Sequence, residues 1–364
     1  MKVLHILHGI ERSGLESMLL CATEAFDAAG VETHVLGTGA AQGELAKEFR
    51  VSGYTVHHAP FRVATGYFHQ LYALMRRERF DVVHIHTEQA FFWYGLTARV
   101  AGVPRVVHHV HAYFPFEGPL RVERILQRWL GRALLGMKSL AVSPSVAANE
   151  RTRFLNPSTL IGNWVDAVAF HPISLDQRVA LRKHLALPAS ASLIVSVGAC
   201  VPLKNHELIV ESMVLVERMA PGVHYVHVGT GSEEAAEQAL AQHLGVHALC
   251  HFLGARGDVA HVLAACDLMV MPSDREGLPM AALEALSCGL PVVATDVPGL
   301  RDVVINERTG VLVDANAESV AVAVTRMLAD PALRQRLGAE GRRRVIERHS
   351  PDAGVAAWLE VYRG

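Results

Sequence analysis

The chain has 364 residues, of which 51% are hydrophobic and 19% charged, and its formal net charge is −2. This length and apolar content predict a globular protein of two domains with an ample core. The balanced charge argues against a general nucleic-acid binder, because such proteins usually carry a clear basic excess.

Strands and helices alternate along the first half of the chain. Apolar, β-branched runs predict strands at residues 3–7, 32–36, 54–58, 81–86, 105–111 and 139–142. Amphipathic runs predict helices at residues 15–29, 42–50, 67–79, 90–101, 119–136 and 144–154. The segment 165–188 has two prolines and weak periodicity, so we expect the link between domains there.

The second half repeats the alternation. Strands are predicted at residues 193–197, 225–228, 251–253, 268–271, 292–294 and 310–313. Helices are predicted at residues 205–219, 232–244, 257–265, 280–287 and 300–305, and over most of the remaining chain. Such alternation predicts an α/β fold of two doubly wound, Rossmann-like domains, each with a parallel sheet covered on both faces.

Hydropathy and cysteine content indicate the compartment in which the protein resides. The N-terminal run reads as a first strand and lacks a small-residue cleavage site, so no signal peptide is expected. No uncharged apolar run reaches about 18 residues, which predicts no transmembrane helix. Five cysteines without a close pair or a metal-type spacing favour free thiols in a reducing cytoplasm.

The most informative stretch runs from Ser273 to Glu284. It joins a strand to a helix and carries carboxylates at Glu276 and Glu284. The free amides of the first helical turn, after Pro279, form a ready anion site. The stretch could therefore hold the diphosphate and ribose of a nucleotide, or it could be a capped helix with a surface glutamate.

Two other strand-to-helix loops leave similar alternatives open. Gly9 to Gly14 has two glycines but not the third of a dinucleotide fingerprint, so it is either a ligand loop or a tight turn. Gly198 to Asn205 contains Lys204, which could reach a bound diphosphate or lie in solvent, and it lacks a Walker pattern.

Histidines end two strands of the first half. Alternation puts His109 and His111 on one face of their strand, while His86 ends another. A zinc site would need a third ligand and no H-E-x-x-H pattern occurs, so most of the histidines are expected to be packed or capping residues. A histidine at a strand end that faces a cleft could instead form a hydrogen bond with substrate. No two aspartates are separated by a single residue, so a metal-binding Asp-x-Asp pair is absent, and no G-x-S-x-G elbow occurs.

The segment 119–138 combines basic and apolar residues at helical spacing. Its basic residues are Arg121, Arg124, Arg128, Arg132 and Lys138. Such a helix could lie on an anionic membrane, or it could pack on the core with a solvated basic face.

Taken together, these motifs resemble those of the retaining glycosyltransferases of family four, which have the GT-B fold of two facing Rossmann-like domains. The matching positions are Gly14-x-Glu16, Asn163-x-Val165-Asp166, Phe170, Pro172, Val197-Gly198, Lys204, Gly229-x-Gly231, Gly254, Pro272-Ser273, Glu276 to Pro279, Glu284-Ala285, Gly289 to Ala294, Asp296, Gly299, Asp302 and Gly310. The resemblance implies an acceptor domain at 1–170, to which a C-terminal helix at about 350–364 could return, and a donor domain at 171–349.

The resemblance also implies roles for individual residues. Glu284 would hold the ribose, Glu276 would contact the donor sugar and Lys204 would neutralise the leaving diphosphate. On the acceptor side, His111, or His109 as its alternative, would touch the sugar. The remaining implied contacts are the donor-side residues Gly277, Leu278, Pro279, Met280, Gly198, Gly229 and Gly231, and the acceptor-side residues Ser13, Gly14 and His86.

Two residues depart from the family pattern. A basic residue usually follows Gly198, where this chain has Ala199, and a glycine usually follows Asn163, where it has Trp164. With Ala199 at this position, either Lys204 carries more of the phosphate charge or another arginine takes the place of the missing basic residue.

The expected activity is a retaining transfer from a nucleotide-diphosphate sugar, most simply a UDP- or GDP-sugar, with no metal ion or other cofactor. The expected acceptor is a glycan or a lipid-linked intermediate of cell-surface polysaccharide synthesis. The expected location is the cytoplasm, with peripheral binding to the inner face of the membrane through 119–138. Alternatives are an epimerase of the same fold and a non-catalytic nucleotide-sugar binding subunit.

Overall fold

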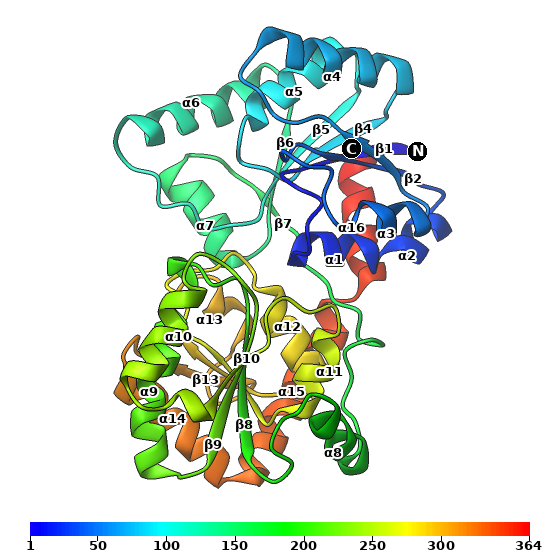
Figure 1. The fold of residues 1–364 in the computed structure, drawn as a ribbon. Helices are drawn as coiled ribbons and strands as arrows, with labels where there is room; N and C mark the ends of the chain where they lie inside the picture. The colour runs from blue at the N-terminus through cyan, green and yellow to red at the C-terminus, as the bar shows by residue number, and fades with distance from the viewer. The chain divides into compact units, whose positions relative to one another are not determined.

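The computed structural model describes residues 1–364 and divides them into two compact units. Unit 1 comprises Met1–Asn163 together with Pro351–Gly364, and unit 2 comprises Trp164–Ser350. Each unit is built on one sheet flanked by helices (Figure 1). The predicted α/β class with two parallel sheets is confirmed.

The sheet of unit 1 has seven parallel strands in the order β3-β2-β1-β4-β5-β6-β7. The strands are β1 (Lys2–Leu7), β2 (Glu32–Gly37), β3 (Thr55–His58), β4 (Val82–Ile85), β5 (Arg105–Val110), β6 (Lys138–Ala141) and β7 (Thr159–Leu160). Sequence patterning misses β7, because its two residues are exposed and show no apolar run.

The helices of unit 1 are α1 (Gly14–Leu20), α2 (Thr23–Ala28), α3 (Ala46–Val51), α4 (Thr65–Glu78), α5 (Phe91–Val100), α6 (Gly118–Ala133), α7 (Pro144–Arg153) and α16 (Pro351–Arg363). The single helix predicted at 15–29 is therefore two helices. Cys21 caps α1, and the Thr23 hydroxyl donates to the Leu20 carbonyl at 2.7 Å, where the chain turns into α2. In Figure 1, α16 (red) lies beside α2.

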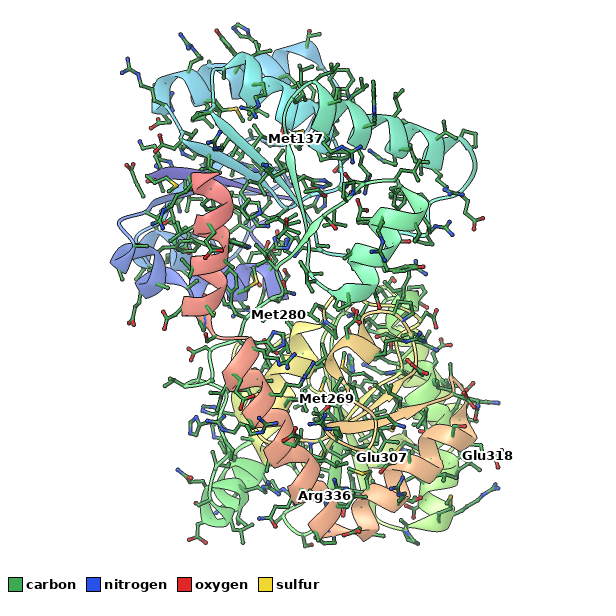
Figure 2. All side chains as sticks on the ribbon, turned by 180° about the vertical axis from the view of Figure 1, so that it is seen from behind. Met137, Met269, Met280, Glu307, Glu318 and Arg336 are labelled. Carbon is green, nitrogen blue, oxygen red and sulfur yellow. The ribbon has the colours of Figure 1, made fainter.

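The sheet of unit 2 has six parallel strands in the order β10-β9-β8-β11-β12-β13. They are β8 (Ser192–Val197), β9 (Val223–Val228), β10 (Cys250–Phe252), β11 (Leu268–Met271), β12 (Val292–Thr295) and β13 (Gly310–Val313). Met269 of β11 lies inside this layer, which is seen from behind in Figure 2, and its side chain is fully buried.

The helices of unit 2 are α8 (Leu175–His184), η1 (Pro202–Lys204), α9 (Glu207–Met219), α10 (Glu234–His243), η2 (His247–Leu249), α11 (Val259–Ala265), α12 (Met280–Ser287), α13 (Leu300–Val303), α14 (Ala317–Ala329) and α15 (Pro331–Arg348). The first of them, α8, lies within the segment expected to link the domains. A capping box of Ser174 and Gln177 starts it. Arg182 then anchors it to Asp267 at 2.8 Å. Short, polar helices such as this one lack the apolar stripe that sequence patterning detects.

No helix of the structure combines the length and the apolar character needed to cross a lipid bilayer.

Candidate functional site

The strand order of unit 2 places two loops side by side. The chain winds outward from β8 in one direction and from β11 in the other, so the order reverses between these neighbouring strands. In doubly wound sheets, ligands bind at the carboxyl ends of the strands at such a reversal. The loops that leave β8 and β11 there are 198–205 and 272–279, which carry Lys204 and Glu276.

Lys204 and Glu276 meet at this point, although 71 residues separate them in the chain. The Lys204 ammonium lies 2.6 Å from Glu276 Oε1, and Ser273 donates its hydroxyl to the same oxygen at 2.8 Å. The Lys204 side chain is 23% exposed and that of Glu276 10% exposed, so the pair is sheltered but open to a ligand on one side. Sequence reasoning assigned no role to Ser273, although it lies within the motif.

The turn that carries Glu276 is held on both sides by backbone bonds. The Asp274 amide donates to the Leu203 carbonyl at 3.0 Å, and the Glu276 amide donates to the Pro298 carbonyl at 3.0 Å. Gly299 has φ +85°, and a Cβ there would stand 2.4 Å from the Glu276 carbonyl oxygen. Only glycine permits this approach.

Glycines also let the Lys204 loop pack against the loop that follows β9. A Cβ on Gly229 would lie 1.8 Å from the Gly198 carbonyl oxygen, and one on Gly231 would lie 2.2 Å from the Cys200 carbonyl oxygen. The Gly-x-Gly pattern at 229–231 therefore has a direct packing reason. Ala199 is exposed at the edge of the same loop.

Helix α12 follows the Glu276 turn directly. Pro279 is its N-cap, one residue earlier than the first helical position expected for it. The first helical residue, Met280, is labelled in Figure 2. Gly277 and Leu278 lie buried in the turn before the helix. The N-terminal amides of a helix, with the helix dipole, favour an anion at this end.

Glu284 lies one turn into α12 and is 9% exposed. Burial raises the pKa of its carboxyl to about 7. A buried glutamate among apolar neighbours is costly to ionise unless a ligand supplies hydrogen-bond donors. Glu284 is therefore suited to accept bonds from a polar ligand such as a ribose.

The strand order of unit 1 reverses between β1 and β4, and the loop that leaves β1 carries Ser13 and Gly14. Ser13 is the N-cap of α1, which begins at Gly14, and its hydroxyl donates to the Glu16 carboxylate. Burial raises the pKa of Glu16 to about 7, against the lowering effect of the Ser13 hydroxyl.

A cavity of about 240 Å³ lies at the carboxyl ends of β4 and β5. It is lined by His8, His86, Thr87, Glu88, His108, His109, Val110, His111, Ala112 and Phe114. The three histidines predicted as acceptor-side candidates are therefore brought to one pocket. Glu88, which sequence reasoning did not single out, is the acidic residue in its wall.

His86 and His111 belong to a hydrogen-bonded row of imidazoles. His86 Nδ1 lies 2.9 Å from His111 Nε2, and His86 Nε2 lies 3.0 Å from His5 Nδ1. Burial lowers the pKa of all three side chains, so the row is neutral. His86 thereby orients the outer ring, His111, which is half-buried.

His109 is turned differently from His111. It is 1% exposed, and its Nε2 donates to the Ile161 carbonyl at 3.1 Å. Its other ring nitrogen has no hydrogen-bond partner. Of the two alternatives, His111 is the less buried residue.

The basic face of helix α6 is not solvated, although a solvated basic face is one of the two alternatives expected; its arginines contact unit 1 instead. Arg128 is 3% exposed and is held by Glu150 at 2.7 Å and Glu88 at 3.0 Å. Arg124 lies 3.7 Å from Glu88, and Arg121 donates to the Arg153 carbonyl at 3.1 Å. The basic face is thus largely occupied within unit 1.

The apolar face of α6 is exposed instead. Val122 is 66% exposed, Leu126 53% and Trp129 52%, at helical spacing on one side of the helix. We call these three residues the α6 apolar stripe. On the inner side, Met137, which follows α6 in the chain and is labelled in Figure 2, lies against both helices: a Cβ would stand 2.5 Å from its Sδ on Gly95 of α5 and 3.1 Å from it on Gly131 of α6.

A larger cavity, of about 770 Å³, lies elsewhere in unit 2, where α8, α11 (Val259–Ala265), α15 and the turn at 288–291 line it. Its walls include Arg178, Arg334 and Arg342 but none of the predicted site residues. Cavity volume alone is therefore a poor guide to the functional site. The strand topology and the contact between Lys204 and Glu276 indicate a different place in unit 2.

Family models match both halves of the chain. The model described as Glycosyl transferases group 1 matches residues 177–344, and the model described as Glycosyltransferase Family 4 matches residues 12–168.

Two curated relatives cover most of the chain. A D-inositol 3-phosphate glycosyltransferase of Xylanimonas cellulosilytica is 30% identical over 308 residues, which are 78% of this chain and 72% of the relative. The UDP-Gal:alpha-D-GlcNAc-diphosphoundecaprenol alpha-1,3-galactosyltransferase of Escherichia coli is 29% identical over 273 residues, which are 72% of this chain and 70% of the relative.

Among solved structures, Anabaena Alr3699/HepE in complex with UDP and glucose matches with a TM-score of 0.86. The two chains are 18% identical, and the match covers 99% of each. At this identity the likeness concerns the fold alone, and it confirms the two-domain GT-B architecture.

Proposed function

This chain belongs to the family of Glycosyl transferases group 1, and we propose that it is a retaining enzyme that moves a sugar from a nucleotide-diphosphate sugar to an acceptor hydroxyl. The observation that carries the proposal is the meeting of Lys204 and Glu276 at 2.6 Å, at the reversal of the second sheet. A cation and a carboxylate at that edge match the charge of a departing diphosphate and of the sugar that it leaves.

The donor nucleotide would bind unit 2. The buried carboxylate of Glu284 would accept the ribose hydroxyls, and the amides of residues 277–280 would contact phosphate or sugar. Lys204 has three N–H donors, of which Glu276 occupies one, so it can keep that contact while it binds the diphosphate. These roles agree with those that the family resemblance implies.

The transfer would proceed without a metal ion in the reaction. As the bond between the anomeric carbon and the diphosphate oxygen breaks, positive charge grows on the sugar and negative charge on the leaving group. Lys204 and the helix amides stabilise the leaving group, and Glu276 lies near the sugar. The acceptor oxygen then bonds to the anomeric carbon on the same face, and its proton passes to the departing diphosphate.

The acceptor would bind unit 1, at the pocket lined by His86, His109 and His111. His111 is neutral and half-buried, so it can exchange a hydrogen bond with a sugar hydroxyl without carrying a charge. The Escherichia coli relative uses UDP-Gal and a diphosphoundecaprenol-linked acceptor by its name. By analogy we propose a UDP-sugar donor and a lipid-linked acceptor of polysaccharide synthesis for this chain.

A lipid-linked acceptor implies contact with a cytoplasmic membrane surface, and the α6 apolar stripe is the part of unit 1 suited to it. Exposed tryptophan and aliphatic side chains on one helical face insert at the headgroup level of a bilayer. The arginines of α6 would contribute less than expected, because Arg128 and Arg124 are engaged by carboxylates.

The first experiment is a thermal-shift screen of UDP-, GDP- and ADP-sugars, followed by a transfer assay with the donor that stabilises the protein. We expect Lys204→Ala to lower kcat/KM roughly 10²- to 10³-fold, as loss of leaving-group stabilisation does elsewhere. Ala199→Ser is the matched control in the same loop and should leave the rate near that of the wild type. Near-normal transfer by Lys204→Ala would refute the site assignment.

A further inference from the structure

A second cluster of reactive side chains lies in unit 2, beneath the loop that carries Lys204. It consists of Cys200 in that loop, His206 at the start of α9, His227 in β9 and Glu237 on α10. One donor atom from each residue lies within 4.8 Å of the others. Figure 1 shows the elements concerned, β8, β9, α9 and α10, as neighbours in the green part of unit 2.

All four side chains are removed from solvent. Their residues are 0%, 3%, 1% and 1% exposed in the order Cys200, His206, His227 and Glu237. Glu237 Oε2 has no hydrogen-bond partner, although it is buried. A buried carboxylate oxygen without a hydrogen-bond donor is costly, and a cation bound beside it would remove that cost.

The contacts within the cluster resemble the edges of a coordination polyhedron. Cys200 Sγ lies 3.1 Å from His227 Nε2, and His206 Nδ1 lies 3.3 Å from Glu237 Oε1. Zinc–ligand bonds of about 2.0–2.3 Å in a tetrahedron place neighbouring ligand atoms roughly 3.3–3.8 Å apart. The other pairs of donor atoms lie within 4.8 Å, so a contraction of the cluster would bring all four donors to bonding distance of one ion.

The surroundings of His227 favour the ligand role. Its Nδ1 lies 2.8 Å from Ser196 Oγ, which in turn lies 2.6 Å from the Tyr225 hydroxyl. A hydrogen bond from Nδ1–H to the serine oxygen would leave the lone pair of Nε2 directed into the cluster. Outer partners of this kind fix the tautomer of metal-binding histidines.

We propose that Cys200, His206, His227 and Glu237 bind a structural zinc ion. One sulfur, two imidazole nitrogens and one carboxylate suit zinc in a closed tetrahedral site. Four protein ligands leave no open position for substrate, so the ion would take no part in the sugar transfer. Such a site is not detectable in the sequence, because its ligands come from four separate segments with no common spacing.

The ion would tie the Lys204 loop to the neighbouring strand and helix. The Cys200 amide already donates to the Thr230 carbonyl at 3.0 Å, and the Glu233 amide donates to the Cys200 carbonyl at 2.9 Å. A metal bond at Cys200 would fasten the same loop through its side chain. Because the site forms only on folding, binding of the ion would add directly to the stability of unit 2.

The test is the metal content of the full chain, purified without a polyhistidine tag from zinc-supplemented culture. We expect one zinc ion per chain in the wild type and almost none in Cys200→Ser. Cys266→Ser removes another fully buried thiol of unit 2 and should retain the ion. Wild-type protein without zinc, or Cys200→Ser with as much zinc as the wild type, would overturn the proposal.

A second readout covers the case in which Cys200→Ser does not fold. Cobalt substituted into the wild type should show a thiolate-to-cobalt charge-transfer band with tetrahedral d–d bands, and Cys266→Ser should show the same spectrum. Chelation should lower the Tm of the wild type, and added zinc should restore it. A cobalt spectrum without the thiolate band, or a Tm that chelation leaves unchanged, would refute the site.

Discussion

At the scale of single residues, burial decides what Glu284 can do. Its pKa of about 7 means that the unliganded carboxyl is largely protonated below neutral pH. Ribose hydroxyls donate to the ionised form, so donor binding should release a proton. We expect affinity for a UDP-sugar to rise with pH between about 6 and 8, at most tenfold per pH unit, and to be measurable by calorimetry.

The matched variant for this pH effect is Glu284→Gln, which cannot ionise. Its donor affinity should be weaker than that of the wild type at high pH and nearly independent of pH. In the absence of donor, the raised pKa costs the wild type stability as pH rises from about 4.5 to about 7, so the variant should unfold later than the wild type at pH 8. An equally steep pH dependence in both proteins would contradict the role of Glu284.

The contribution of Arg128 to stability follows from the carboxylates that it contacts. It bonds Glu150 and Glu88 and stacks over the Phe154 ring at 4.5 Å. Arg128→Met would leave two buried carboxylates without their cation. We expect a loss of about 3–5 kcal/mol in the free energy of unfolding, measured by chemical denaturation.

Arg132, one turn further along α6, supplies the control. It is exposed and donates only to the Leu155 carbonyl, at 3.3 Å. Arg132→Met should therefore change stability by less than about 0.5 kcal/mol. Equal losses in the two variants would mean that the buried ion pairs contribute little.

Residue-scale prediction from sequence was limited by contacts between distant positions. Glu276, Glu284 and Lys204 could be proposed because each lies in a local motif with a chemical reason. The partners Glu88 and Glu150 of Arg128, and the ligands gathered around Cys200, could not be found this way. These residues are far apart in the sequence, and their local spacing does not predict that they are in contact in the folded protein.

At the scale of elements, α6 gives the clearest test. The α6 apolar stripe predicts binding to anionic vesicles, which flotation measures. Replacement of Leu126 and Trp129 by glutamate should lower the bound fraction roughly tenfold or more, because two apolar anchors are lost and charge is added. Charge reversal at Arg124 and Arg128 would be a poor test, since it would break ion pairs inside unit 1.

Val179→Glu is a suitable control, because Val179 is also an exposed apolar residue on a helix, at 53%, but lies in unit 2 on α8. It should float as the wild type does. If the double variant floats equally well, or the wild type does not bind vesicles, the membrane proposal for α6 fails.

The strands were the elements most accurately predicted. Buried apolar runs such as Val292–Thr295 and Leu268–Met271 form strands where expected, within one residue. The orientation of α6 was not predictable, because periodicity identifies two faces without telling which one the core receives. Arginines usually lie on the solvent-exposed face of a helix. In α6, buried carboxylates bind Arg128 on the inner face instead.

At the scale of the whole molecule, the distribution of buried histidines predicts different acid responses of the two units. Burial lowers the pKa of seven histidines in unit 1, namely His5, His57, His84, His86, His108, His109 and His111. In unit 2, outside the proposed zinc site, it lowers the pKa of two, namely His224 and His251.

An unfolded histidine takes up a proton near pH 6.5, whereas burial lowers the pKa of these folded histidines below that value. Stability is therefore intact above pH 6.5 and is lost as pH falls below it, by up to about 1.4 kcal/mol per pH unit for each histidine. We expect unit 1 to open first on acidification to about pH 5. Hydrogen exchange followed by mass spectrometry would report each unit separately, and earlier opening of unit 2 would contradict this.

Helix α16 has a consequence for how the chain is made. Trp358 and Tyr362 of this helix are buried in unit 1. The Trp358 ring packs against the His84 ring, and the Tyr362 hydroxyl lies 2.6 Å from His84 Nδ1. Yet these residues follow the whole of unit 2 in the chain. During translation, residues 1–163 of unit 1 are synthesised first, but the apolar surface that α16 covers stays exposed until residues 351–364 leave the ribosome. Unit 2 can fold during that wait, so the order of folding should be the reverse of the order of synthesis.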